Sequence, residues 1–266
     1  MLSFPNAKIN LGLRVLSRRA DGYHNLETVM YPVTIKDALE ITDADVTSLE
    51  ILGDSIPGVT LDNLCLRAFN LLAEAYKLPP QKITLLKKIP IGAGLGGGSS
   101  DASAVLNLVD AKFNLQLSVE QKIEYATSLG ADCAFFIENK PVLATGIGNV
   151  FKAVSLDLSV YHIVVVMPDV HISTQNAYQH IIPAIPEISV KELIQKPVVE
   201  WKSNLKNDFE TSVFQRHPVI EELKQHLYNK GAYYASMSGS GASVFGIFPK
   251  DVDLQLPDSY RIYSGV

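Results

Sequence analysis

A glycine-rich junction between a predicted strand and a predicted helix is the feature that most constrains this chain. Residues 90–101 read PIGAGLGGGSSD, with KITLLKKI before them and the helix-like ASAVLNLVDAKF after them. Glycine lets the backbone approach a ligand closely, and the first N–H groups of a helix have no partner inside it. The junction therefore predicts a phosphate-binding turn at the start of a helix from about Ser100 to Phe113; the alternative is a tight turn whose glycines serve packing alone.

Two familiar phosphate loops fit this junction poorly. The Lys-Ser/Thr ending of a P-loop is absent. Gly92, Gly94 and Gly97 formally match the dinucleotide fingerprint G-x-G-x-x-G. That fingerprint needs an acidic ribose ligand about 20 residues further on, where this chain reads FNLQL. A hydride-transfer enzyme is therefore disfavoured.

Composition narrows the class of protein. The 266 residues suffice for one large domain or two smaller ones, and 47% hydrophobic with 19% charged residues is typical of a globular chain. A net charge of −5 disfavours a general nucleic-acid surface but allows a local basic pocket. Only Cys65 and Cys133 are present, which favours a reducing cytoplasm. Neither a signal peptide nor a membrane span is expected, and the scattered histidines predict no zinc site.

The N-terminal part mixes strands and helices. Strands are predicted at 7–16, after DGYHN, at DALEIT, at TSLEIL and at 82–89. A helix is predicted over 62–78 with Asp62 as its N-cap. Another is predicted over 118–130, where Ser118 and Gln121 form a capping box and Gly130 ends the helix.

The C-terminal part continues the mixture. The pattern predicts a strand at YHIVVVMP, a helix at STQNAYQHI, and a connector over 183–203 with one short helix. A helix ending at Gly231 and a strand, Gly/Ser turn and strand over 232–249 follow. Without strict βαβ alternation, an α+β class is favoured, with domains at 1–152 and 153–266.

Three stretches together resemble the motifs of the GHMP kinases, the superfamily of galactokinase, homoserine kinase and mevalonate kinase. They are residues 5–28, the glycine-rich junction, and SMSGSGASVFGIF at 236–248. The ordered series AKINLGL, RADGYH, DNLCLRA, GLGGGSSDA, LGADCAFF and KNDFE is similar to the branch of 4-diphosphocytidyl-2-C-methyl-D-erythritol kinases. The resemblance implies an N-terminal ATP-binding domain like ribosomal protein S5 domain 2, a C-terminal ferredoxin-like α/β-plait domain, and an active site between them.

The same resemblance implies a reaction and its catalytic residues. ATP would transfer its γ-phosphate to the 2-hydroxyl of the cytidylylated methylerythritol, a step of isoprenoid biosynthesis. Asp132 matches the family's catalytic aspartate and Lys8 its catalytic lysine, and we expect the two to pair. Asn10 lies two residues after Lys8, so it shares a strand face and can orient the hydroxyl. The alternatives are a turn or capping aspartate and a solvated strand lysine.

Ligand contacts are implied residue by residue. Tyr23 and Tyr178 would stack on the two faces of cytosine, His24 would read its edge, and Thr174 would lie near the substrate. Ordinary half-buried tyrosines are the alternative. The expected ATP-binding residues are Pro90, Ile91, Gly92, Ala93, Gly94, Leu95, Gly96, Gly97, Gly98, Ser99, Ser100, Asn63 and Lys87.

Charge and metal binding complete these expectations. Lys87 and Lys88 would supply positive charge unless they are solvated edge-strand lysines, and SGSGAS at 238–243 would flank the acceptor phosphates. Mg²⁺ would be held mainly by ATP phosphates, with Ser99 or Ser100 as the one conceivable protein ligand and no dedicated metal site.

Two other functions remain open at this stage. One is a GHMP kinase with a different small hydroxyl acceptor, which the ADGYH stretch disfavours. The other is a nucleotide-binding module without catalysis, which the joint presence of Lys8 and Asp132 disfavours. We expect a cytoplasmic monomer or weak homodimer that binds small molecules and neither nucleic acid nor membrane.

Overall fold

The computed structural model describes residues 1–55, 62–170, 172–179 and 181–266. The chain divides into two compact units that are discontinuous in sequence. Unit 1 comprises Met1–Ala7, Thr34–Ile91 and Gly96–Lys140, and unit 2 comprises Lys8–Val33, Gly92–Leu95 and Pro141–Val266. Residues on both sides of the glycine-rich junction therefore contribute to each unit. The domain boundary near residue 152 stays a prediction.

Unit 1 is built on a four-stranded sheet. Its order is β1 (Leu2–Ser3), β4 (Ala38–Asp43), β6 (Gln81–Lys87) and β5 (Ser48–Gly53). β6 pairs antiparallel with β4 and parallel with β5, so it is a central strand. Its alternate residues, from Gln81 to Lys87, are buried. This strict period of two places Lys87 on the same inward face as Ile83 and Leu85.

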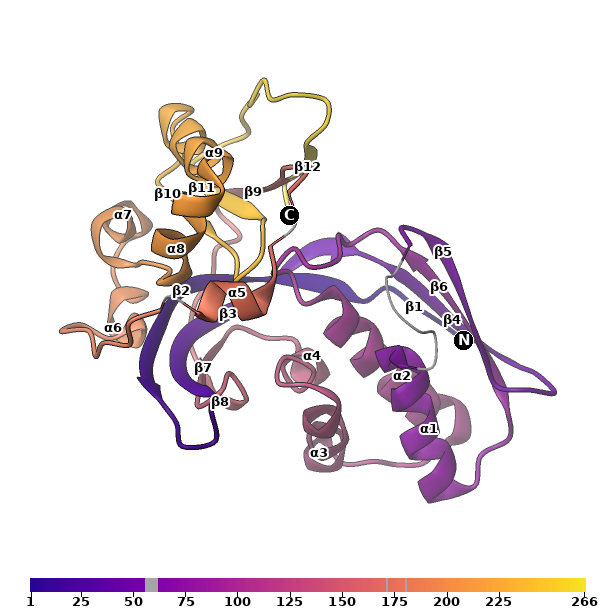
Figure 1. The fold of residues 1–266 in the computed structure, drawn as a ribbon. Coiled ribbons are helices and arrows are strands. Elements are labelled where there is room, and N and C mark those ends of the chain that lie inside the picture. The colour runs from indigo at the N-terminus through magenta and orange to yellow at the C-terminus, as the bar shows by residue number, and fades with distance from the viewer. Residues whose placement is uncertain (56–61, 171, 180) are drawn as a thin grey trace. The chain divides into compact units, whose positions relative to one another are not determined.

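Helices α1 (Leu64–Tyr76) and α2 (Gly97–Phe113) pack together on one face of this sheet (Figure 1). Asn63 caps α1, because its Oδ1 accepts a hydrogen bond from the Cys65 N–H at 2.9 Å. The prediction of Asp62 as the cap is therefore wrong by one residue. α2 begins at Gly97 rather than near Ser100, so the last glycines of the junction belong to its first turn.

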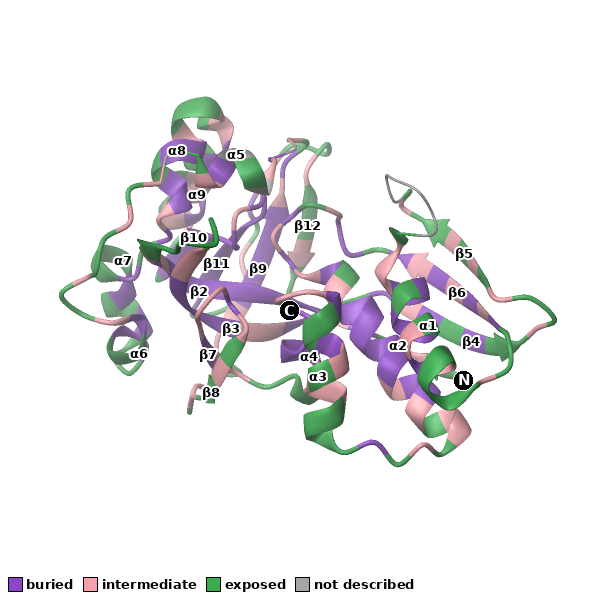
Figure 2. Cartoon of the chain, turned by 60° about the horizontal axis from the view of Figure 1, so that its bottom comes forward, coloured by how far each residue is buried: buried purple, intermediate pink, exposed green. Residues whose placement is uncertain are grey.

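The helices of unit 1 differ in burial. α2 is buried along much of its length, whereas α3 (Val119–Leu129) is largely exposed (Figure 2). The capping box of Ser118 and Gln121 and the end at Gly130 are confirmed. A short helix, α4 (Phe135–Glu138), follows after a tight turn. The turn between α3 and α4 carries Asp132.

Two further sheets carry the strands of unit 2. One has the order β2 (Asn6–Arg18), β3 (His24–Lys36), β7 (Val142–Thr145) and β8 (Val150–Ala153). The other has the order β10 (Tyr234–Met237), β11 (Val244–Phe248), β9 (His162–Met167) and β12 (Arg261–Ser264), all antiparallel. The edge strand β12 is short and mostly exposed, so it has no alternation of apolar and polar residues. The sequence pattern therefore did not predict this strand.

A series of helices lies between β9 and β10, two strands of the same sheet. They are α5 (Thr174–Tyr178), α6 (Val190–Leu193), the 3-10 helix η2 (Val198–Glu200), α7 (Trp201–Asn204), α8 (Phe209–Arg216) and α9 (Pro218–Asn229). The prediction of one short helix in the 183–203 connector is therefore wrong, because α6, η2 and α7 occupy it. Phe209, Ile220 and Leu223 are among the buried residues that join α8 and α9 to the core of unit 2.

Candidate active site

Lys8 and Asn10 lie on β2, in a run of seven buried residues from Ala7 to Leu13. The Lys8 ammonium donates to Asn10 Oδ1 at 2.5 Å and to the Gly94 carbonyl at 3.1 Å. Asn10 Nδ2 donates to Thr28 Oγ1 at 3.2 Å. The expected shared face of Lys8 and Asn10 is confirmed. A solvated strand lysine is excluded at position 8, because Lys8 is only 3% exposed.

The glycines at 94 and 241 permit two backbone turns of unit 2 to touch. A Cβ atom on Gly94 would lie 1.9 Å from the Ser238 carbonyl oxygen, and one on Gly241 would lie 2.2 Å from Gly94 N. Ser238 Oγ donates to the Gly94 carbonyl at 2.9 Å, and the Ser243 N–H donates to the Ala93 carbonyl at 3.3 Å. These glycines therefore serve close packing of the two turns beside Lys8.

The start of α2 in unit 1 has the features of an anion site. Gly96 is its N-cap in the left-handed region (φ 69°) and has no side chain to cap the helix. The first turn, Gly97–Ser100, carries no acidic side chain. A Cβ atom on the exposed Gly98 would meet nothing nearer than Leu64 Cδ1 at 4.0 Å. The helix N–H groups and the positive end of the helix dipole are thus available to an anion beside bare backbone.

Gly97, by contrast, faces the interior of unit 1. A Cβ atom there would lie 2.7 Å from Lys87 Nζ and 2.8 Å from Ile89 Cγ2. Lys87 is 2% exposed on a central strand, so the alternative of a solvated edge-strand lysine is wrong for it. Lys88 is exposed. The side chain of Lys87 therefore lies directly beneath the first turn of α2.

Two aspartates that the sequence reasoning missed hold Lys87 in place. Its ammonium contacts Asp37 Oδ2 and lies 2.8 Å from Asp101 Oδ2. Asp37 Oδ1 also accepts from the N–H groups of Lys88 at 2.5 Å and Ile89 at 2.8 Å. The cluster of Asp37, Lys87 and Asp101, here called the ionic cluster, links the end of β6 to α2. With two carboxylates to one ammonium, it supplies no surplus positive charge to a nucleotide.

Asp101 is the unusual member of the ionic cluster. Its Oδ1 atom is buried and has no hydrogen-bond partner in the described part of the chain. Burial and the charge of Asp37 raise the pKa of Asp101 to about 7, although Lys87 opposes the shift. In the sequence, the feature that could have drawn attention to Asp101 is its place in the GGGSSDA motif, one helical turn after Gly97.

Asp132 is half-buried in the turn between α3 and α4, and buried residues Cys133, Ala134 and Phe135 follow it. Ser103 Oγ on α2 lies 2.7 Å from the Cys133 carbonyl and 2.9 Å from the Ser99 carbonyl. This hydroxyl therefore ties the turn that carries Asp132 to the first turn of α2. Asp132 belongs to unit 1 and Lys8 to unit 2, so their pairing stays a prediction.

The expected cytosine residues lie in unit 2. Tyr23 is 63% exposed, and the His24 ring stacks on the Tyr178 ring with centroids 5.1 Å apart at 26°. Phe209 packs edge-on against the same tyrosine at 4.7 Å. Tyr178 thus meets His24, and the sandwich with Tyr23 stays a prediction. Thr174 begins α5, and its side chain lies outside the described part of the structure.

Comparisons with known proteins identify the family. Residues 63–140 match the GHMP kinases N terminal domain, and residues 189–256 match the GHMP kinases C terminal domain. A 4-diphosphocytidyl-2-C-methyl-D-erythritol kinase from Bacteroides fragilis is 55% identical over 252 residues, 93% of this chain and 92% of that protein. The chain belongs to this kinase family.

Solved structures agree with this assignment. A crystal structure of 4-(cytidine 5'-diphospho)-2C-methyl-D-erythritol kinase is 30% identical and has a TM-score of 0.82, covering 100% of this chain and 98% of that chain. Homoserine kinase from Cytophaga hutchinsonii, at 16% identity and a TM-score of 0.69 over 98% of this chain and 94% of that one, shares the fold alone. The expected α+β class and two-domain GHMP kinase fold are confirmed.

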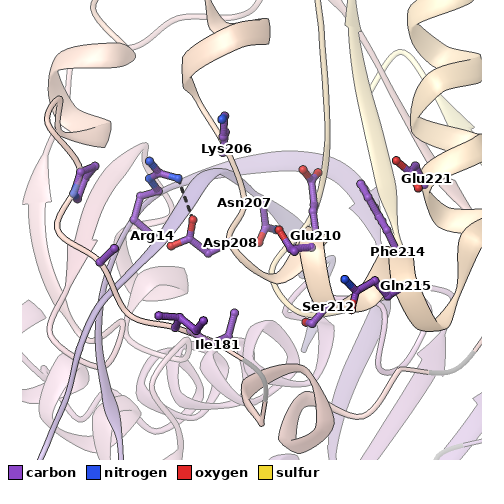
Figure 3. A pocket seen from close by; sticks show the side chains of 14 residues that line it. Arg14, Ile181, Lys206, Asn207, Asp208, Glu210, Ser212, Phe214, Gln215 and Glu221 are labelled. Atoms are coloured by element: carbon purple, nitrogen blue, oxygen red, sulfur yellow. Dashed lines mark hydrogen bonds and ion pairs between the residues drawn. The ribbon is translucent and has the colours of Figure 1, made fainter.

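One cavity of this kinase lies in unit 2 and has a volume of about 790 Å³ (Figure 3). None of the expected site residues lines it. Its Arg14 pairs with Asp208 at 2.8 Å, and its Glu210 pairs with Lys224 at 2.6 Å. The charged lining of the cavity therefore includes two ion pairs formed inside the unit. The cavity borders the KNDFE motif, residues 206–210.

The described residues offer neither a metal-binding cluster nor a membrane-spanning helix. No three His, Cys, Asp or Glu side chains there gather in a way that could hold a metal ion. No helix in the described ranges has both the length and the apolar character needed to span a membrane.

Proposed function

We propose that this chain transfers the γ-phosphate of ATP to the 2-hydroxyl of 4-diphosphocytidyl-2-C-methyl-D-erythritol, a step toward isoprenoid precursors. The observation that carries the proposal is the 55% identity, over 93% of the chain, to a curated kinase of that name. A homoserine or mevalonate acceptor has weaker support, because the similar structures with those names are only 14–19% identical. The presence of both Lys8 and Asp132 favours an active enzyme over a binding module.

In the proposed reaction, the oxygen of the substrate hydroxyl attacks the γ-phosphorus of ATP, and Asp132 accepts the proton of that hydroxyl. The bond between the γ-phosphorus and ADP breaks, and ADP leaves. The Lys8 ammonium stabilises the negative charge that develops, and Asn10 orients the acceptor. Burial supports this role for Lys8, because a fixed cation acts more strongly away from water. The start of α2 would hold the ATP phosphates, with Gly98 allowing close approach of the backbone.

The nucleotide site would extend around that helix start. We assign residues 90–100 and Asn63 to it as contacts, and Lys87 as a support from beneath α2 rather than as a free cation. Mg²⁺ would neutralise phosphate charge and would be held mainly by ATP oxygens, with a hydroxyl of Ser99 or Ser100 as one protein ligand. Hydroxyl, phosphate and water oxygens are ligands that suit this ion.

Cytosine would bind between Tyr23 and Tyr178, with His24 at its edge and Thr174 nearby. Since His24 stacks on Tyr178, its ring would have to leave that face when the base enters. The imidazole would then be available for hydrogen bonds to the base edge. We further propose a cytoplasmic monomer or weak homodimer that engages neither nucleic acid nor membrane.

Steady-state ATP consumption tests the assignment with the cytidylylated acceptor, its uridine analogue, mevalonate and homoserine. We expect turnover with the cytidine compound and a much lower kcat/KM with the others, because a site that hydrogen-bonds the base edge rejects a mismatched edge. Asp132→Asn should lower kcat by ~10²–10⁴-fold while ATP binding is retained. Equal use of cytidine and uridine forms by the wild type would contradict the assignment.

A further inference from the structure

The KNDFE motif contains a buried amide whose hydrogen-bonding groups are engaged. Asn207 is 3% exposed. Its Nδ2 donates to the carbonyls of Met237 at 3.0 Å and Gly239 at 2.8 Å, and its Oδ1 accepts from the Phe209 N–H at 3.0 Å. The amide therefore holds both ends of the segment that contains Ser238. A buried amide that satisfies two facing carbonyls fixes their positions, because leaving them unpaired would be costly.

The segment held by Asn207 reaches Lys8 through a short chain of contacts. Ser238 Oγ accepts from the Asn10 N–H at 3.3 Å and donates to the Gly94 carbonyl at 2.9 Å. The Lys8 ammonium donates to that carbonyl at 3.1 Å and to Asn10 Oδ1 at 2.5 Å. Every member of the chain lies in unit 2. A shift of Ser238 would therefore move the oxygens that orient Lys8.

The segment around Asn207 is itself anchored to β2. Asn207 forms an isolated parallel bridge with Leu13, whose N–H donates to the Lys206 carbonyl at 2.9 Å. Asp208 accepts from the Val15 N–H and from Arg14, both at 2.8 Å (Figure 3). Asn207 thus joins the strand that carries Lys8 to the turn that contacts Asn10 and Gly94.

We propose that Asn207 is a positioning residue that fixes the Ser238–Gly239 turn and, through it, the Lys8 ammonium. The proposal rests on the proposed function, because it takes Lys8 as the group that stabilises the transferred charge. Displacement of a catalytic group by about 1 Å can cost on the order of 10²-fold in rate. An amide is required at 207, because a carboxylate of the same shape would place an oxygen against two carbonyl oxygens.

The first test is Asn207→Asp, with Arg14→Gln as the matched control. The control removes the ion pair to Asp208 from the same segment and leaves the Asn207 contacts intact. We expect Asn207→Asp to lower kcat by roughly 10- to 100-fold with little change in KM for ATP, and Arg14→Gln to leave kcat unchanged. A folded Asn207→Asp enzyme with wild-type kcat, or an equal loss in Arg14→Gln, would overturn the proposal.

Ser238→Ala provides a second test that does not depend on the folding of Asn207→Asp. It removes the hydroxyl that joins the turn to Asn10 and Gly94, so kcat should fall while KM for ATP holds. The double variant should lose less than the product of the two single losses, because both act through one turn. Wild-type kcat in Ser238→Ala, or fully independent losses in the double variant, would overturn the proposal.

Amide hydrogen exchange separates this proposal from the proposed function. The Asn10 N–H should exchange faster in Asn207→Asp than in the wild type, because its acceptor Ser238 moves. This readout needs no turnover. If the wild type fails to phosphorylate any acceptor, the proposed function fails by itself, whereas unchanged exchange at Asn10 in a folded Asn207→Asp protein overturns the positioning role.

Discussion

Both units bury a lysine beside glycine-rich backbone, but the groups that position the two lysines differ in kind. In unit 1, Lys87 lies between the carboxylates of Asp37 and Asp101 beneath the first turn of α2. In unit 2, the groups that accept hydrogen bonds from Lys8 include the Asn10 amide oxygen and the Gly94 carbonyl, and the Ser238 hydroxyl donates to that carbonyl. The first arrangement depends on charge balance and the second on the direction of hydrogen bonds.

This difference predicts different consequences of mutation. Removing one member of a buried ionic cluster leaves an uncompensated charge and destabilises the fold. A neutral network orients a side chain and does not titrate near neutral pH, so damage to it should appear mainly in the rate. We therefore expect changes in unit 1 to move stability and its pH dependence, and changes in unit 2 to move kcat.

The largest effect on stability is expected for Lys87→Met. The change leaves Asp37 and Asp101 buried without their cation, which should lower the free energy of unfolding by about 3–5 kcal/mol. Denaturant unfolding measures this loss, and Lys88→Met at the exposed neighbouring position is the control, with an expected change within about 0.5 kcal/mol. Equal losses in the two variants would show that the ionic cluster does not carry the stability of this region.

In Lys8→Met we expect the opposite balance, with a large loss of rate and a smaller loss of stability. Methionine fills similar space, but the ammonium that would stabilise the developing charge is lost, so kcat should fall by ~10²–10³-fold. The loss of unfolding free energy should be smaller than in Lys87→Met, since the partners left behind by the change include the neutral oxygens of Asn10 and Gly94. Single-turnover phosphate transfer and denaturant unfolding on the same samples decide the point. If Lys8→Met kept the kcat of the wild type but lost as much unfolding free energy as Lys87→Met, the comparison between the two lysines would be contradicted.

A smaller effect is expected on the pH dependence of stability in Asp101→Asn. The pKa of Asp101 is raised from 3.8 to about 7 in the folded chain, so the folded state binds a proton that the unfolded state has already released between these values. The contribution of Asp101 to stability is therefore present below about pH 4 and is lost as the pH rises to about 7. Asp37 and Lys87 are the charged groups that act most strongly on Asp101, and the Cys65 thiol in this region stays neutral because burial raises its pKa.

The measurement for this variant is a difference between two curves. The free energy of unfolding of the wild type minus that of Asp101→Asn should decline from pH 4 to pH 7 and then level off. Subtraction removes the opposite slope that ordinary surface carboxylates contribute. A flat difference over this range would show that the ionic cluster is not held as the structure describes.

Local signals account for what the sequence predicted well. The ends of α3 depend on Ser118, Gln121 and Gly130, which are neighbours in sequence, and the shared face of Lys8 and Asn10 follows from the period of a strand. Choosing Asp62 over Asn63 as the cap failed because both residue types cap well, and only the backbone path shows which oxygen reaches the Cys65 N–H.

Contacts distant in sequence account for what was missed. Asp37 lies 50 residues from Lys87, and no pattern of either segment announces their contact. Asn207 lies 32 residues from Gly239, so KNDFE could be recognised as a motif without revealing what it holds. The side of α2 on which Gly97 lies depends on where the helix starts, and the predicted start near Ser100 hid its contact with Lys87.

The smallest expected effect separates two adjacent glycines on α2 that face in different directions. Gly98→Ala adds a methyl group with nothing nearer than 4.0 Å, and alanine favours a helix over glycine by roughly 0.5–1 kcal/mol, so stability should hold or rise slightly. If bare backbone at 98 meets phosphate, KM for ATP should nevertheless rise severalfold.

Gly97→Ala is the matched control, since its methyl group would press on Lys87 and Ile89 at 2.7–2.8 Å and disturb the ionic cluster. Its expected effect is lower stability. Unchanged ATP affinity in a stable Gly98→Ala enzyme would mean that the phosphates are held elsewhere along the junction, and that the glycines of α2 serve packing alone.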